Sequence, residues 1–247
     1  MNDQSPKFED KLAIVKKRNI RRFKLSNIFS WILDGFSLDH GAFYTLKNLS
    51  FKPGEMVKSY LQQGRLDFTP PFRLLLVTTT LVLISFEYSG IQDETVTNFN
   101  TLNDSNTSEE ITMYFGELFQ RYANIFLWLI IPFFSLFSWS FNRKSGFNYA
   151  ENLILNTYYT VFVNLLFIIL LADQWVSSGV LLTIYMVLSI IHYMLCLKGM
   201  FGISWLRSFW QMLGIFSISI ILYGLFIALL TSGLIAYLID SGQITTS

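Results

Sequence analysis

Five stretches of this chain are long, apolar and almost free of charge, and they constrain its fold more than any other feature. They cover residues 72–86, 125–141, 153–171, 179–197 and 212–238. A hydrocarbon core ~30 Å thick needs about 20 apolar helical residues to cross it. Because backbone groups in lipid have no water to bind, each crossing segment must be a helix. The sequence therefore predicts an all-α, polytopic bundle of five membrane helices.

The composition agrees with a membrane protein. Of the 247 residues, 52% are hydrophobic and 14% are charged, whereas soluble domains average about 25% charged residues. With their flanks, the expected spans cover about 70–89, 121–141, 153–172, 178–197 and 211–239. Because the first residues are polar, we do not expect a cleavable signal peptide. A single cysteine, Cys196, leaves no intramolecular disulfide or cysteine-cluster metal site.

Basic residues are distributed unevenly along the chain. Thirteen of the 18 lysines and arginines precede or open the first expected span. Four more lie in the loops after the second and fourth spans: Arg143, Lys144, Lys198 and Arg207. Because cytoplasmic loops carry the excess of Lys and Arg, we expect the N-terminus inside and the C-terminus outside. The acidic, polar loop 90–120 then faces outward, and residues 241–247 form a short tail.

The part before the first span divides at residue 22. Residues 1–22 are basic and show little apolar periodicity, so we expect a mobile tail. Residues 23–69 place apolar side chains at helical spacing, which predicts short amphipathic helices at the cytosolic side. Such helices would lie in the interface or pack under the bundle. They could instead form a docking surface for a cytosolic partner.

Two of these helices have clear start signals. Asp39 is placed to cap a helix running through Lys47, and Pro53 suits the first position of the next helix. Gly64 is placed to end that second helix. The apolar side of the first is expected to hold Phe43, Leu46 and Leu49. The apolar side of the second is expected to hold Met56, Val57, Tyr60 and Leu61.

Residues 34–73 combine an aspartate, an LD-x-G-x-x-x-T stretch, a P-G pair, YL-x-x-G-R and a proline before the first span. The matching positions are Asp39, Gly41, Thr45, Pro53, Gly54, Tyr60, Leu61, Gly64, Arg65 and Pro70. Residues 149–154 and 201–207 contribute further matches. Together they resemble the signature of a bacterial family of multi-span membrane proteins of unknown function. The resemblance implies a multi-pass protein of the bacterial cytoplasmic (inner) membrane and implies no activity.

The chain departs from that family in two places. Many members begin with a zinc-ribbon-like array of paired cysteines, which this chain lacks. Many also carry histidines where the third span opens, and here those positions hold residues such as Asn152, Tyr158 and Thr160. Zinc binding is therefore not carried over, and we expect neither a metal nor a cofactor.

Few side chains suggest chemistry. His40 with Asp34 and Asp39 could hold a divalent cation, although Asp39 as a helix cap explains the same spacing. The sequence contains no phosphate loop, nucleophile elbow or metalloprotease helix pair, so no catalytic residue is expected. Within the spans, the polar candidates are Asn156, Asn164 and His192. For His192 a structural contact is favoured over a proton relay, and Asn164 should bind another helix.

The last span carries small residues at every fourth position: Gly224, Ala228, Ser232 and Ala236. Such a row lets another helix approach closely. Packing within the bundle is the expected use, and a seam between two copies is the alternative.

These features favour a non-enzymatic accessory or scaffold subunit of a membrane protein complex. Its partner or lipid contacts would be formed by a cytosolic group: Asp39, His40, Pro53, Tyr60, Gly64 and Arg65. Arg65 would bind a carboxylate or a lipid phosphate. The expected partners are the bilayer and other membrane proteins or a second copy, and no nucleic acid. The alternatives are a transporter or channel for a small solute, ion or lipid, and a membrane enzyme acting on lipid.

The topology can be tested by cysteine labelling. A cysteine placed at Ser105 in a Cys196→Ala background should react with a membrane-impermeant maleimide added outside intact cells, because the loop 90–120 is expected there. A cysteine at Ser145 serves as the inside control. Reaction of the Ser105 site only after the cells are opened would reverse the topology.

Overall fold

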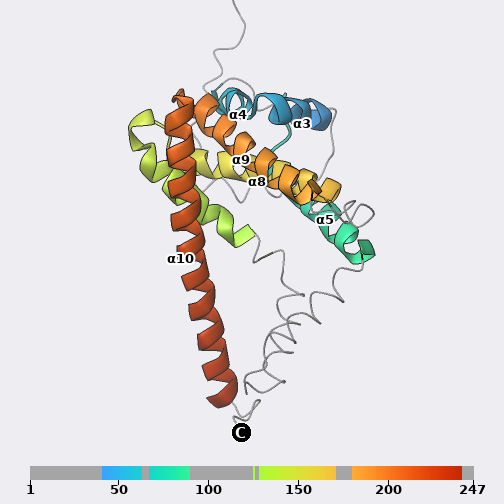
Figure 1. Ribbon diagram of the computed structural model, residues 1–247, viewed down its shortest axis with the longest axis vertical. Helices are drawn as coiled ribbons and strands as arrows, with labels where there is room; N and C mark the ends of the chain where they lie inside the picture. Colours follow the sequence, from blue (N-terminus) through green and yellow to red (C-terminus); the bar gives the residue numbers. More distant parts are fainter. Residues whose placement is uncertain (1–40, 63–66, 90–124, 126–127, 171–179, 241–247) are drawn as a thin grey trace, which may run out of the picture.

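The computed structural model describes residues 41–62, 67–89, 125, 128–170 and 180–240 (Figure 1). Its helices are α3 (Gly41–Phe51), α4 (Pro53–Gln62), α5 (Pro71–Ser89), η2 (Arg143–Ser145), α8 (Tyr149–Leu170), α9 (Val180–Phe201) and α10 (Trp205–Asp240), with a further helix over Trp128–Phe141. No strand occurs in these parts of the chain, so the predicted all-α class is confirmed. The expected tails, the amphipathic stretch 23–40 and the loop 90–120 lie outside the described residues.

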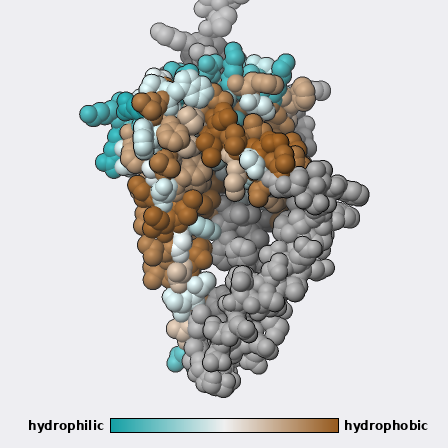
Figure 2. Space-filling view, in the orientation of Figure 1, coloured by the Kyte–Doolittle hydropathy of each residue, from teal (hydrophilic) through white to brown (hydrophobic). Residues whose placement is uncertain are grey.

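Among the described residues, three helices are long and apolar enough to cross a membrane, and they indicate an integral membrane protein. The candidate spans are Tyr149–Ile169, Val180–Phe201 and Trp205–Leu234. Two shorter apolar helices, Pro71–Ser85 and Trp128–Phe141, lie where the first and second spans are predicted. Figure 2 shows hydrophobic residues over the body of the molecule and hydrophilic residues at the end where α3 and α4 lie.

The helices α3 and α4 lie across one end of the bundle (Figure 1). Together with residues 67–70, they form a unit that we call the cap. The helix α4 begins at Pro53, as the sequence predicts, and buries the four expected residues: Met56, Val57, Tyr60 and Leu61. The Tyr60 ring packs edge-on against Tyr158 of α8, with centroids 5.5 Å apart. The cap thus shares its core with the membrane helices.

The first cap helix differs from its prediction in length and in orientation. It continues past Lys47 to Phe51, because no proline or glycine interrupts it before Pro53. Phe43 is 80% exposed, whereas Thr45 and Leu49 are fully buried. Positions 45 and 49 are one turn apart and share a face, and residue 43 lies well around the helix from them. The placement of Phe43 with Leu49 is therefore wrong.

Aromatic side chains join four helices in the core. The ring of Tyr193 from α9 lies 4.6 Å from Tyr159 of α8 and 5.0 Å from Phe216 of α10, centroid to centroid. Phe134, from the helix over Trp128–Phe141, lies 4.9 Å from Phe216. Aromatic pairs at such distances add about 0.5–1.5 kcal/mol each beyond the area they bury. This cluster fixes the first part of α10 against the bundle.

Two glycines, Gly54 of α4 and Gly199 of α9, bring the backbones of their helices into direct contact. A Cβ added at Gly54 would lie only 2.7 Å from the Cα of Gly199, and a Cβ at Gly199 only 2.9 Å from the Cα of Gly54. The nearest atoms are backbone, so they cannot move aside as a flexible side chain would. Only glycine at both positions allows the cap to lie this close to α9.

Alanine usually stabilises a helix relative to glycine. Here, however, replacing either glycine should destabilise the protein. Gly54→Ala and Gly199→Ala should each lower the free energy of unfolding by about 1–3 kcal/mol, because overpacking forces the backbones apart. Gly224→Ala is the matched control: its added Cβ would meet nothing within 4 Å. Alanine there should raise stability by up to about 1 kcal/mol. The measurement is unfolding in detergent, and equal stabilisation at all three positions would contradict the contact.

Candidate functional site

The cap is attached to the bundle at a backbone carbonyl that Pro53 leaves without its usual partner. In a continuing helix, the carbonyl of Leu49 would accept from the amide of residue 53, but proline has no N–H. Leu49 is fully buried, so water does not supply the donor. Instead, Nε2 of His192 on α9 lies 2.8 Å from the Leu49 carbonyl oxygen. Since a carbonyl only accepts, Nε2 must carry the proton.

The ring of His192 is held in place on its other sides as well. It stacks on the ring of Phe162 with centroids 3.5 Å apart and planes within 6°. Its Nδ1 lies 3.7 Å from Sγ of Cys196, one turn along α9. The side chain is 2% exposed. His192 therefore bridges α8, α9 and α3, and its hydrogen-bond partner is a cap carbonyl.

A second connection runs through the backbone of Thr69. The amide of Thr69 donates to Oγ1 of Thr45 at 2.8 Å, and the hydroxyl of Tyr158 donates to the carbonyl of Thr69 at 2.7 Å. The Thr45 hydroxyl in turn donates to the carbonyl of Gly41 at 2.7 Å. The backbone N–H and C=O of the buried Thr69 are thus both satisfied, the first by Thr45 of α3 and the second by Tyr158 of α8. The cap is fixed to the start of α5.

Polar side chains inside the bundle pair across helices. Asn156 accepts from the hydroxyl of Tyr193 at 2.9 Å, which joins α8 to α9. Asn152 accepts from the Ser138 hydroxyl at 2.7 Å, which joins α8 to the preceding helix. Such bonds between membrane helices contribute roughly 0.6–2 kcal/mol each. Asn156 therefore serves as a helix contact in this structure.

Asn164 lies deeper along α8 and contacts α5. Its Nδ2 is 3.0 Å from Oγ1 of Thr79 and 3.3 Å from Oγ1 of Thr78. The same Thr79 hydroxyl accepts from the indole nitrogen of Trp128 at 3.0 Å. One threonine thus joins three helices, and Asn164 has the partner on another helix that its position requires.

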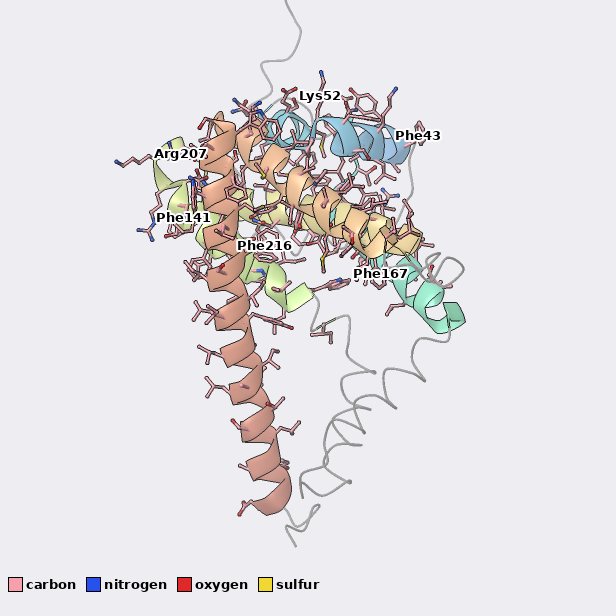
Figure 3. The ribbon with its side chains drawn as sticks, viewed as in Figure 1. Phe43, Lys52, Phe141, Phe167, Arg207 and Phe216 are labelled. Atoms are coloured by element: carbon pink, nitrogen blue, oxygen red, sulfur yellow. The ribbon has the colours of Figure 1, made fainter. Side chains whose placement is uncertain are left out.

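The face of α3 that points away from the bundle is exposed and carries aromatic and basic side chains. Phe43 and Phe51 are 80% and 77% exposed, and Lys47 lies between them on α3. Lys52 follows and is also exposed. Figure 3 shows Phe43 and Lys52 at the outer side of the cap. We call Phe43, Lys47, Phe51 and Lys52 the outer face of α3.

The predicted site residues divide into three groups. Pro53 and Tyr60 lie in the cap, whereas the other members of the cytosolic group lie outside the described residues: Asp39, His40, Gly64 and Arg65. Asn156, Asn164 and His192 lie in the contacts given above. The small row of α10 is exposed throughout: Gly224, Ala228, Ser232 and Ala236. Around Gly224, the rings of Tyr223 and Phe226 still contact Phe133, and packing of the small row within the bundle stays a prediction.

Two further polar features are notable. Arg73 opens α5 and is only 8% exposed, and its Nη2 nitrogen has no hydrogen-bond partner among the described residues. Among the residues that the structure describes, no three side chains of His, Cys, Asp or Glu lie close enough together to hold a metal ion.

The class of protein that these features define is a helical membrane protein whose α3–α4 cap is fixed to one end of its bundle. A family described as protein of unknown function (DUF3667) matches residues 39–83. This segment contains both cap helices, the linker to α5 and most of α5. No curated protein and no solved structure matches the chain. The similarity thus falls on the cap, and the family description names no activity.

The His192 bond can be tested by a double-mutant cycle. His192→Leu should lower the free energy of unfolding by about 1–3 kcal/mol, because it leaves the buried Leu49 carbonyl without a donor. Pro53→Ala restores an amide at the position where a helix would supply it. His192→Leu should therefore cost less in the Pro53→Ala background. Equal losses in both backgrounds, measured by unfolding in detergent, would show that the carbonyl does not depend on His192.

Proposed function

We propose that this protein is a non-enzymatic accessory or scaffold subunit of a membrane protein complex. The observation that carries the proposal is the outer face of α3. Its two phenylalanines are more than three-quarters exposed, on a helix whose other face is buried. They stand eight residues apart, about 12 Å along the helix. Aromatic side chains at this spacing, with lysines beside them, suit a docking surface for another protein.

The attachment of the cap supports this use. A surface that is already rigid loses little conformational freedom on binding, so more of the contact energy appears as affinity. The cap is fixed by His192 at the Leu49 carbonyl and by Tyr158 at the Thr69 carbonyl. The contact of Gly54 with Gly199 adds backbone packing. The outer face of α3 is thus presented in one orientation relative to the membrane helices.

The chemistry of the outer face specifies the partner. Phe43 and Phe51 would enter apolar recesses, and Lys47 and Lys52 would pair with carboxylates. The partner that fits is a protein segment with apolar and acidic residues. The neighbouring face of α4, where Lys58 is exposed, carries no such aromatic pair.

The proposed setting is the bacterial inner membrane, crossed five times, with the cap in the cytoplasm. Basic residues at the cap end of the bundle support this orientation. Arg143 lies 4.5 Å from the centre of the Trp139 ring, and Lys198 lies 4.4 Å from that of Trp205. Tryptophans and basic side chains together are typical of the interface between bilayer and cytoplasm.

The proposal is tested by capturing partners from native membranes. The full-length protein, purified in mild detergent after crosslinking in cells, should retain a protein partner. Phe43→Ser and Phe51→Ser should each weaken its recovery at least about tenfold, because exposed aromatic residues dominate such contacts. Lys58→Ser on α4 is the matched control and should retain the partner.

Three outcomes decide the matter. Loss of the partner from the phenylalanine variants at unchanged thermal stability supports the proposal. Full recovery with both phenylalanine variants contradicts it. A particle that is strictly monomeric and free of partners under all conditions contradicts it as well.

A further inference from the structure

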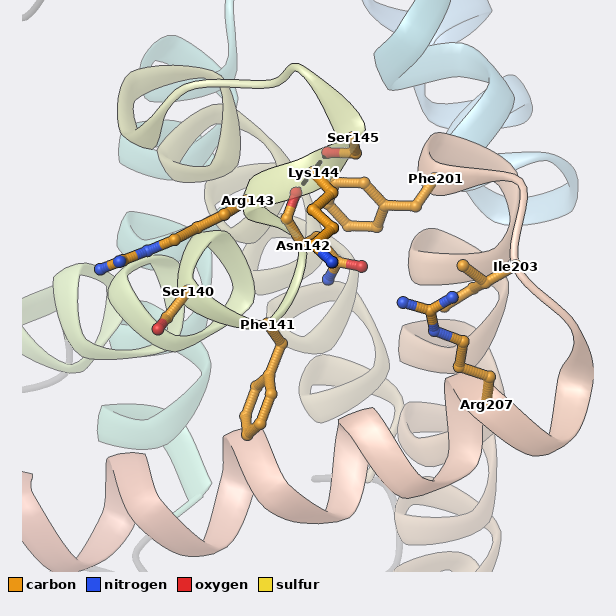
Figure 4. A pocket seen from close by; sticks show the side chains of 9 residues that line it. All are labelled: Ser140, Phe141, Asn142, Arg143, Lys144, Ser145, Phe201, Ile203 and Arg207. Carbon is orange, nitrogen blue, oxygen red and sulfur yellow. Dashed lines mark hydrogen bonds between the residues drawn. The ribbon is translucent and has the colours of Figure 1, made fainter.

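A cavity of about 510 Å³ opens between two turns at the cap end of the bundle. One turn joins the helix over Trp128–Phe141 to α8, and the other joins α9 to α10. Its lining includes Asn142, Lys144 and Arg207, with the side chains of Phe201 and Ile203 beside them (Figure 4). None of the residues that line the cavity belongs to the outer face of α3.

The charge of this cavity has one sign. Arg143, Lys144 and Arg207 line it, and none of its lining residues is acidic. Arg143 stacks over Trp139, and Figure 4 shows it pointing away from Arg207. The guanidinium of Arg207 points toward Asn142 in Figure 4, and Lys144 lines the same cavity. Two cations from separate turns therefore converge on one space without a carboxylate among the lining residues to neutralise them.

Hydrogen bonds hold the two turns in this arrangement. The Asn142 amide donates to the Ser138 carbonyl at 3.0 Å, and its oxygen accepts from Nε2 of Gln211 on α10 at 3.1 Å. Each turn also contains a glycine in the left-handed region: Gly146, with φ 82°, and Gly202, with φ 67°. The Gly202 amide closes α9 by donating to the Lys198 carbonyl at 2.8 Å. The cations are thus presented by a fixed frame.

We propose that this cavity binds a phosphate group. A guanidinium donates two parallel hydrogen bonds to phosphate oxygens, and an ammonium adds a compact positive charge. An anion between Lys144 and Arg207 would also remove their mutual repulsion. The volume is well above that of a phosphate, which leaves room for the group that carries it. The apolar side of the cavity, at Phe201 and Ile203, suits an organic substituent.

The place of the cavity favours a phospholipid headgroup as the source. Trp139 and Trp205, which stack on Arg143 and Lys198, flank the cavity in sequence, and such tryptophans sit at the level of the headgroups. Basic pockets between membrane helices bind anionic headgroups. Topology alone explains why basic residues occur in both loops, but it does not explain why Lys144 and Arg207 line one cavity. A free phosphorylated solute has the same group and is separated from lipid by the experiment.

The experiment uses the full-length protein, delipidated in detergent, and native mass spectrometry. The probes are dioctanoyl phosphatidylglycerol, dioctanoyl phosphatidylcholine and inorganic phosphate. Wild type should bind phosphatidylglycerol at least about tenfold more tightly than phosphatidylcholine, since only the former has net negative charge. Lys144→Gln and Arg207→Gln should each weaken that binding about tenfold or more. Lys198→Gln removes the same charge at the same end, outside the cavity, and should bind as wild type does.

Further measurements distinguish a lipid headgroup from a free phosphorylated solute and replace any variant that does not fold. Tight binding of inorganic phosphate that displaces the lipid would identify a free phosphorylated solute as the ligand. Should the Arg207→Gln protein fail to fold, Arg207→Lys and Lys144→Gln still report on the cavity. Wild-type protein that binds neither phosphate nor phosphatidylglycerol selectively overturns the proposal. An equal loss of binding in the Lys198→Gln control also overturns it.

Discussion

The structure depends on a hydrogen bond that Pro53 makes necessary. A proline between two short helices separates them and leaves the Leu49 carbonyl without an amide. Burying that oxygen unpaired would cost about 1–3 kcal/mol. His192 supplies the donor from a membrane helix, and its ring is fixed by Phe162. The break between α3 and α4 is therefore also the point at which the cap is attached to the bundle.

The other contacts at this end follow from the same placement. Once the Leu49 carbonyl lies over α9, the start of α4 must pass directly across that helix, and Gly54 and Gly199 make the passage possible. Thr69 then lies between Thr45 and Tyr158, which fixes where α5 begins. Together the three contacts give the cap one position. The outer face of α3 and the basic cavity are both presented by this end of the molecule.

Sequence pattern predicted the helices better than the contacts between them. The five apolar runs, the start of α4 at Pro53 and the apolar stripe of α4 all follow from periodicity and from proline chemistry. The partner of His192 could not be predicted in this way, because a backbone carbonyl has no residue-type signal. The free carbonyl itself could have been inferred, since any proline four residues later creates one.

The one wrong placement is that of Phe43. Apolar residues usually face the core, yet exposed aromatic residues are the informative exceptions. For the small row of α10, periodicity predicts a packing face but does not identify the helix that would cover it. Gly199, by contrast, lies in an ordinary apolar helix and shows its role only when the cap is in place. Contacts of this kind join segments that are far apart in the sequence, so they are recognised only in the tertiary structure.

The length of α10 has a mechanical consequence. The last ring contact of α10 among the described residues joins Phe226 to Phe133, and the 14 residues that follow extend about 21 Å from that point. A tilt of only 10° at Phe226 would displace the far end by about 4 Å. A long apolar helix accommodates a change in bilayer thickness by tilting. A tilt of α10 would act on the aromatic cluster at its base, where Phe216 contacts Tyr193 and Phe134.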